Sequence, residues 1–136
     1  MELNPYLNFN GQCREAMEYY ARVLGGTITA MITFGDMPGG EQCSPEMSSG
    51  IMHAAIDLGG SKLLASDCPP EMYEPPKGIS VAVHPTDPAE AERIFNALAE
   101  GGTVTMPVQE TFWALRFGMC VDRYGIAWMV NCAKAE

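Results

Sequence analysis

Basic residues and long apolar runs are both scarce in this chain of 136 residues. Eight lysines and arginines stand against 17 aspartates and glutamates, so the formal net charge is −9, and no basic stripe is present that nucleic acid or an anionic membrane would bind. No segment approaches the roughly 20 apolar residues that span a bilayer, and the first residues lack the basic and apolar regions of a signal peptide. These absences predict a cytoplasmic protein with neither a nucleic-acid nor a membrane partner.

Cysteine and histidine are too few or too scattered for several kinds of site. The five cysteines include no Cys-x-x-Cys pair, which excludes a zinc knuckle, and their odd number argues against a disulfide framework. The only histidines are His53 and His84. The remaining composition, with 47% hydrophobic and 18% charged residues, is typical of one globular domain with a buried core.

What the sequence does contain is a short motif that occurs twice. Residues 25–29 read Gly-Gly-Thr-Ile-Thr and residues 101–105 read Gly-Gly-Thr-Val-Thr, at an offset of 76. Apolar residues spaced by three and four positions precede each motif and predict an amphipathic helix that ends at the paired glycines. The apolar stripes are Cys13, Ala16, Met17, Tyr20 and Leu24 in the first helix, and Ala91, Ile94, Phe95 and Leu98 in the second.

Alternating or β-branched segments predict strands before and after each helix. They cover residues 3–10, 27–34, 51–58 and 62–67 in the first half, and about 79–84, 103–111, 114–121 and 126–132 in the second. The order βαβββ thus occurs twice, in a module of about 1–67 and a module of about 78–136, joined by a proline-rich linker of about 68–77. Because each sheet has one helix for one face, we expect a single α+β domain at 1–136. Its two βαβββ modules would curl around a shared cleft, with the helices outside.

Four segments together resemble a known family. They are residues 5–11 (Pro-Tyr-Leu-Asn-Phe-Asn-Gly), 33–38 (Thr-Phe-Gly-Asp-Met-Pro), 109–114 (Gln-Glu-Thr-Phe-Trp-Ala) and 124–131 (Tyr-Gly-Ile-Ala-Trp-Met-Val-Asn). The chain resembles the PhnB-like branch of the vicinal-oxygen-chelate superfamily, which includes glyoxalase I, bleomycin- and fosfomycin-resistance proteins and extradiol dioxygenases. The resemblance covers essentially the whole chain and implies a homodimer. It is strongest as a statement about fold.

The same branch shares a sequence-family label with a ubiquinone methyltransferase. The chain shows no doubly wound βαβ pattern and no glycine-rich loop after a first strand, the features that a dinucleotide-type cofactor site would require. The residues therefore give no support for methyl transfer.

Metalloenzymes of the superfamily resemble one another in carrying His or Glu ligands near the starts of the two module-opening strands and within the two module-closing strands. In this chain, those positions are occupied by side chains that are poor ligands for a divalent metal, namely Asn4 or Pro5, Leu64, Gly78 and Met129. We therefore expect no metal of the usual kind and no cofactor. An alternative is a metal-dependent lyase or dioxygenase-type enzyme with relocated ligands, drawn from His53, Glu110 and Asp67.

Two further side chains are candidates for polar contacts with a ligand. His53 alternates with apolar neighbours, and on the cleft face it could act as a general base beside Asp57 or simply bond to a neighbouring group. Arg116 alternates with the apolar Leu115, Phe117 and Met119. Its guanidinium could bind a carboxylate or phosphate, or pair with Glu110 or another cleft carboxylate.

Aromatic residues could line an apolar pocket or belong to the core. Alternation assigns Trp128 to the core. The predicted ligand-binding residues are Tyr6, Asn8, Phe34, His53, Glu110, Trp113, Arg116, Met129 and Asn131, and no residue is assigned a catalytic role. These residues predict a small organic molecule, bound in the cleft between the modules without the usual metal site. A second alternative is a non-catalytic sequestering protein of the drug-resistance type, and the sequence does not decide whether a reaction occurs.

Overall fold

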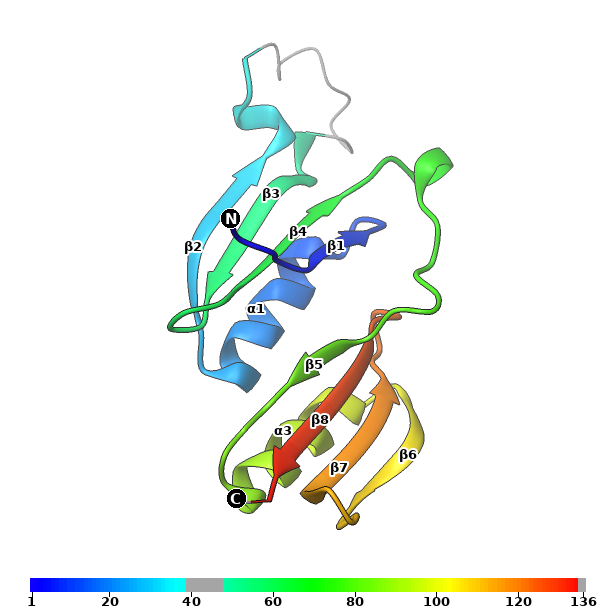
Figure 1. The fold of residues 1–136 in the computed structure, drawn as a ribbon. Helices are drawn as coiled ribbons and strands as arrows, with labels where there is room; N and C mark the ends of the chain where they lie inside the picture. Colours follow the sequence, from blue (N-terminus) through cyan, green and yellow to red (C-terminus); the bar gives the residue numbers. More distant parts are fainter. Residues whose placement is uncertain (39–47, 135–136) are drawn as a thin grey trace. The chain divides into compact units, whose positions relative to one another are not determined.

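The computed structural model describes residues 1–38 and 48–134 (Figure 1). The chain divides into two compact units, Met1–Glu74 and Pro75–Glu136, and the boundary lies within the predicted linker. No helix in the described residues is long and apolar enough to cross a membrane.

Unit 1 is a four-stranded sheet with one helix packed on one face (Figure 1). Its elements are β1 (Tyr6–Phe9), α1 (Cys13–Leu24), β2 (Thr27–Thr33), η1 (Phe34–Asp36), β3 (Ile51–Asp57), β4 (Lys62–Asp67) and the short η3 (Pro70–Met72). The strand order is β1-β4-β3-β2, with β1 parallel to β4 and the other pairs antiparallel. The helix α1 packs against β2, β3 and β4.

Unit 2 repeats this arrangement. Its elements are β5 (Val81–Val83), α3 (Pro88–Ala99), β6 (Thr103–Gln109), β7 (Ala114–Val121) and β8 (Ala127–Ala133). The order β5-β8-β7-β6 again has one parallel pair, β5 with β8, and α3 packs against β6, β7 and β8. The predicted α+β fold of two βαβββ units is confirmed. The opening strands β1 and β5 are shorter than predicted, and Pro5, which has no N–H group to donate to a neighbouring strand, stands directly before β1.

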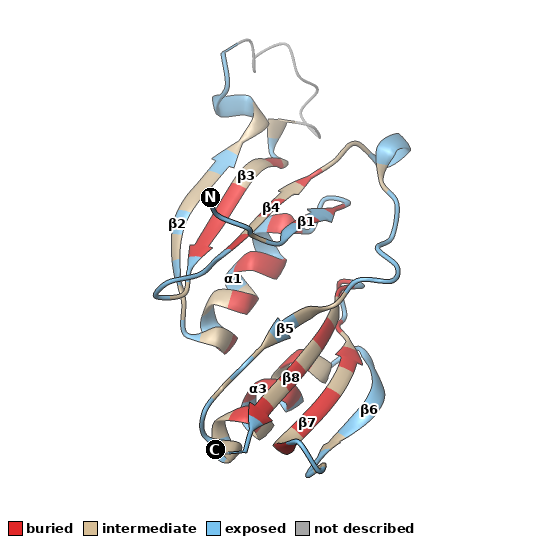
Figure 2. Cartoon of the chain, in the orientation of Figure 1, coloured by how far each residue is buried: buried red, intermediate tan, exposed pale blue. Residues whose placement is uncertain are grey.

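Figure 2 shows buried residues on the helix of each unit and on the strands of its sheet. The predicted stripe of α3 is buried in full, and that of α1 is buried except that Val23 takes the place of Leu24 at its end. Trp128 is 1% exposed, which confirms its assignment to the core.

The duplicated glycine pair has the same two roles in both units. Gly25 and Gly101 adopt positive φ angles of 75° and 77°, a conformation that ends the helix and that other residues rarely adopt. The second glycine of each pair lies against the backbone of a neighbouring strand end. A Cβ atom on Gly26 would lie 3.0 Å from the carbonyl oxygen of Asp57, and one on Gly102 would lie 2.1 Å from that of Val121. The motif therefore recurs because the same turn and the same close approach recur.

The strand registers of the two units correspond residue by residue. In unit 1, Leu64 lies opposite Tyr6 on one side and Ala55 on the other. In unit 2, Met129 lies opposite Ala82 and Met119 in the same way. Leu64 and Met129, at the two predicted ligand positions in the closing strands, are thus structural equivalents.

Candidate functional site

The sheet of unit 1 has a helix-free face, opposite the face that packs on α1. Side chains alternate between the two faces, so Leu7 and Phe9 of β1 are buried on the helix side while Tyr6 and Asn8 are exposed. The strand registers place further side chains on the face of Tyr6. The helix-free face of unit 1 includes Tyr6, Asn8, Ala30, Ile32, His53, Ala55, Asp57, Lys62, Leu64 and Ser66.

Tyr6 and His53 contact each other on this face. The Tyr6 hydroxyl lies 3.4 Å from Nδ1 of His53, and the ring centroids are 6.1 Å apart with an interplanar angle of 30°. The contact reaches across β4, because β1 and β3 flank that strand. A hydroxyl donates and accepts, and an imidazole does one or the other at each nitrogen according to its tautomer. The pair therefore forms a small polar site on this face, whose charged residues Asp57 and Lys62 lie opposite each other in the pairing of β3 with β4.

The helix-free face of unit 2 carries Met119, Met129 and Asn131. The Asn131 side-chain amide nitrogen lies 3.5 Å from Nδ1 of His84, an exposed residue just after β5. The Asn131 carbonyl oxygen is buried and has no hydrogen-bond partner in the described residues. Like the helix-free face of unit 1, this face thus carries one histidine, here beside an amide and the thioether side chains of Met119 and Met129.

The relocated metal set does not form. His53 lies on the helix-free face, whereas Asp67 lies on the helix side of β4, buried and hydrogen-bonded to three backbone N–H groups. Because strand side chains alternate, these two groups cannot converge on one ion. Glu110 of unit 2 instead lies 3.6 Å from Lys134. Within the residues that the structure describes, no group of three or more His, Cys, Asp or Glu side chains is placed to hold a metal.

Arg116 lies on the helix side of its sheet rather than with the helix-free face. Its Nε donates to Glu92 of α3 at 2.9 Å, so the internal ion pair considered as an alternative forms with Glu92 and not with Glu110. Gly118 lies on the same side of the sheet as Arg116, since a Cβ atom on Gly118 would lie 2.7 Å from the ring of Phe95 in α3. Arg116 does lie on the opposite face of β7 from Phe117, as the predicted alternation requires. However, the larger apolar side chains of β7 do not all face the helix α3.

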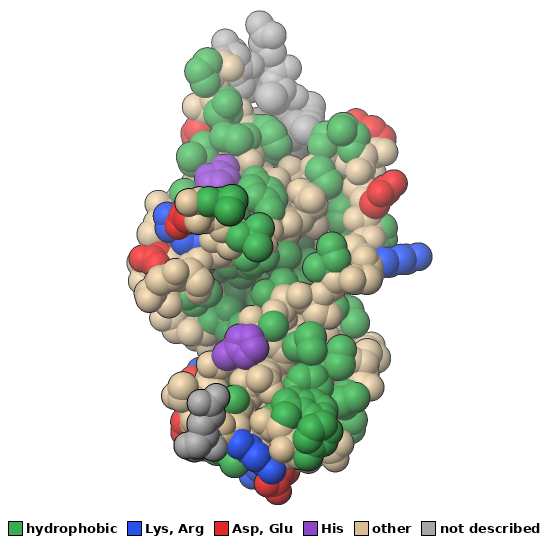
Figure 3. Space-filling model, in the orientation of Figure 1, with side chains coloured by type: hydrophobic (Ala, Val, Ile, Leu, Met, Phe, Trp, Pro, Cys, Tyr) green, Lys and Arg blue, Asp and Glu red, His purple; other side chains and the backbone are tan. Residues whose placement is uncertain are grey.

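The predicted aromatic residues separate into different surroundings. Trp113, 44% exposed, makes edge-on contacts with Phe112 at 4.8 Å and Phe117 at 5.3 Å between ring centroids. Figure 3 shows exposed hydrophobic side chains gathered on unit 2. Among the described aromatic residues, Phe112 is the most exposed, at 87%. Tyr6 stacks on His53, whereas Phe34 lines a separate pocket.

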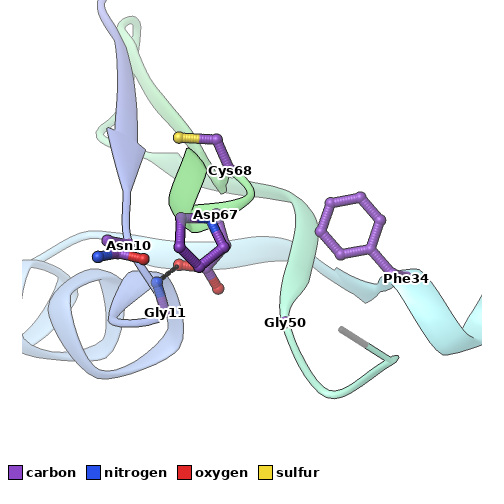
Figure 4. A pocket seen from close by; sticks show the side chains of 7 residues that line it. Asn10, Gly11, Phe34, Gly50, Asp67 and Cys68 are labelled. Atoms are coloured by element: carbon purple, nitrogen blue, oxygen red, sulfur yellow. Dashed lines mark hydrogen bonds between the residues drawn. The ribbon is translucent and has the colours of Figure 1, made fainter. Parts of the chain in front are cut away.

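That pocket, which we call the end pocket, lies where β1 and β4 end and β3 begins (Figure 4). Its volume is about 120 Å³, and it is lined by Asn10, Gly11, Phe34, Gly50, Asp67, Cys68 and Pro70. Sequence reasoning included Phe34 but not Asn10 or Asp67 as neighbours. These residues become neighbours through the parallel pairing of β1 with β4, which brings the residues after the two strands together.

The described thiols differ in surroundings. Burial, and secondarily the charge of Asp67, raises the pKa of Cys13 to about 12. Burial raises the pKa of Cys120 to about 11, with a smaller contribution from Asp122. Cys68 is half-buried, with its sulfur 3.6 Å from the Phe9 carbonyl oxygen. Cys43 lies outside the described residues.

Comparison with known proteins agrees with the fold. Residues 1–131 match the family described as 3-demethylubiquinone-9 3-methyltransferase. The chain is 36% identical to protein YjdN of Escherichia coli K12, over all of this chain and 98% of that protein. The crystal structure of PA1353 from Pseudomonas aeruginosa is 50% identical, covers 99% of each chain and has a TM-score of 0.90. The PhnB protein from Bacillus cereus, at 23% identity, covers 98% of this chain and all of its own, with a TM-score of 0.79.

Three observations assign the family. They are the match over nearly the whole chain, the duplicated βαβββ unit and the sequence identity with two bacterial relatives. The fold is also that of a glyoxalase, bleomycin-resistance and dioxygenase domain. The chain belongs to the family described as 3-demethylubiquinone-9 3-methyltransferase.

Proposed function

We propose that this protein binds a small organic molecule on the helix-free face of unit 1, without the divalent metal site usual in its superfamily. The observation that supports this is the contact between Tyr6 and His53, a hydroxyl and an imidazole side by side on a sheet face. Asn8 and Ser66 extend the polar surface, because they lie opposite each other in the parallel pairing of β1 with β4.

The Tyr6–His53 contact is better suited to binding a ligand than to stabilising the fold. Tyr6 is 46% exposed, and an exposed hydrogen bond as long as 3.4 Å adds little to folding free energy. Both groups can turn a donor toward an oxygen atom of a ligand, such as a carbonyl or carboxylate oxygen. Ala55 and Leu64 beside them provide apolar contact for the rest of the molecule.

Methyl transfer, the reaction named in the family's description, is not part of this proposal. Each described sheet contains a single parallel strand pair and carries one helix. A doubly wound sheet would instead place a glycine-rich turn and a helix N-terminus against a cofactor phosphate. The loop between β1 and α1 contains one glycine, Gly11.

The test is a thermal-shift screen of small organic acids and ketones, with and without added divalent metal or chelator. We expect a stabilising compound to act equally in chelator and to lose most of its effect in Tyr6→Phe and His53→Ala. Tyr19→Phe on α1 makes the same chemical change away from this face and should bind normally. Recovery of the compound unchanged would indicate sequestration, and conversion would indicate an enzyme.

Two results would contradict the proposal. Stoichiometric, tightly held metal in the purified protein, measured by inductively coupled plasma mass spectrometry, would overturn its metal-free part. Stabilisation that is unchanged in both variants would remove Tyr6 and His53 from the site. The expected homodimer is proposed separately, and sedimentation at the monomer mass would refute it.

A further inference from the structure

Among the residues that the structure describes, Asp67 is the only charged side chain that lines the end pocket, and it is 7% exposed. Its Oδ1 accepts the backbone N–H groups of Gly11 at 2.9 Å and Cys13 at 3.0 Å. Its Oδ2 accepts only that of Ile51, at 2.9 Å. A carboxylate offers about four acceptor positions, so one position on Oδ2 is still available.

No described cation neutralises this carboxylate. The ion pairs of the described residues all lie in unit 2 and join Arg93 to Glu90, Arg116 to Glu92 and Lys134 to Glu110. Backbone N–H groups stabilise a carboxylate but leave its net charge in place. A buried charge without a counter-ion is costly, so the pocket favours a positive group.

The rest of the pocket suits the apolar part of a small cation. The ring of Phe34 and the side chain of Pro70 supply apolar walls, and an aromatic face attracts a cation. Figure 4 shows Asn10, Cys68 and Phe34 on different sides of the Asp67 carboxylate. The volume of about 120 Å³ is close to that of a roughly 150 Å³ cavity known to hold benzene. One molecule of a few heavy atoms therefore fits.

We propose that the end pocket binds a compact organic ammonium ion. One N–H group of the ion donates to Oδ2 of Asp67, and its alkyl part lies against Phe34 and Pro70. The Asn10 carboxamide oxygen is placed to accept a second N–H. This site is distinct from the Tyr6–His53 pair, because Asp67 faces the helix side of the sheet. Its test is therefore independent of the proposed function.

The probe is isopropylammonium chloride, titrated into the full chain labelled with ¹⁵N, with 2-propanol as a neutral probe of the same shape and sodium chloride as the salt control. The amide signals of Gly11, Cys13 and Ile51 report directly on Asp67, since all three bond to its carboxylate. We expect these signals to shift and saturate with isopropylammonium. Binding of 2-propanol should be at least about ten-fold weaker, as expected from the loss of a charge-assisted hydrogen bond.

Three variants localise the effect. Asp67→Asn keeps the shape of the side chain and should abolish saturable binding, while Phe34→Leu should weaken it by about three-fold. Asp57→Asn removes an equal charge from the exposed last residue of β3, on the opposite face of the same sheet, and should bind isopropylammonium within about two-fold of the original protein. If Asp67→Asn does not fold, Phe34→Leu and the neutral probe decide the question.

Three outcomes would overturn the proposal. They are no saturable shift in the unmodified protein, equal binding of 2-propanol, and persistence of binding in a folded Asp67→Asn variant.

Discussion

The two units have the same topology and the same strand register, yet their helix-free faces differ. Tyr6 and His53 form a polar contact in unit 1. Following the register from Leu64 to Met129, the corresponding residues of unit 2 are Ala82 and Phe117. Duplication therefore preserved the backbone while the side chains diverged, and only unit 1 has a tyrosine–histidine pair in the described residues.

The buried carboxylates differ in the same way. Asp67 joins backbone groups that are 16 to 56 residues away in the chain, whereas Asp122 accepts from Tyr124, Ile126 and the Trp128 indole within its own turn. Unit 1 thus uses a carboxylate to hold separate segments at the end of its sheet, and unit 2 uses one to order a hairpin. This comparison leads to four predictions.

The largest effect is expected from removing these carboxylates. Asp67→Ala and Asp122→Ala should each cost about 3 kcal/mol or more in free energy of unfolding, because each leaves three donors without a partner. Hydrogen exchange should separate them. Asp67→Ala should speed exchange at Gly11 and Ile51 together, and Asp122→Ala should act mainly at its own turn, including Tyr124. Similar exchange patterns in both variants would show that the two carboxylates do not have these separate roles.

The paired glycines allow a smaller, graded comparison. Gly102→Ala should destabilise by about 3 kcal/mol, since its Cβ would lie 2.1 Å from the backbone oxygen of Val121. Gly26→Ala should cost less, about 1 to 2 kcal/mol, because its nearest obstacles are the side chains of Ile56 and Leu58 and these can shift. Chemical denaturation measures both values. An equal cost would contradict the difference between the two approaches, in which only Gly102 lies tightly against backbone.

The fold could be predicted from sequence because its determinants are local. Helical spacing, paired glycines and alternating strands each specify nearby backbone, and their duplication specified the order of elements. The site was harder because it depends on which sheet face meets the helix. Alternation placed Arg116 and Phe117 on opposite faces of β7, but it did not show that the face of Arg116 is the one that meets Glu92 of α3.

The end pocket could not be predicted from sequence for a related reason. Asn10 and Asp67 become neighbours only through the parallel pairing of β1 with β4, which joins segments far apart in the chain. No spacing rule detects such a meeting, whereas the buried stripe of α3 required only the period of one helix.

The raised pKa values of Cys13 and Cys120 allow a test of whether burial of a thiol affects the pH dependence of stability alike in both units. Their pKa values are raised to about 12 for Cys13 and about 11 for Cys120, so the unfolded thiol, near 9, loses its proton first as pH rises. Stability from each thiol is therefore complete below about pH 9 and falls above it, by about 1 kcal/mol at pH 10. Cys13→Ala and Cys120→Ala should each flatten the decline in unfolding free energy between pH 9 and 10.5, measured by urea denaturation. A variant with an unchanged slope would show that its thiol ionises freely in the folded protein.

The smallest expected effect on stability concerns the helix-free face of unit 1. Tyr6→Phe should change the free energy of unfolding by less than about 0.5 kcal/mol, because the hydroxyl is exposed and its contact with His53 is long. Urea denaturation measures this value, with Tyr19→Phe as the matched control. A loss above about 1 kcal/mol would make the pair a structural contact and remove the main support for a binding role. If Tyr6→Phe leaves the free energy of unfolding unchanged but abolishes stabilisation by the ligand, the Tyr6 hydroxyl serves binding and not folding. The fold would then not need this group, whereas the ligand would.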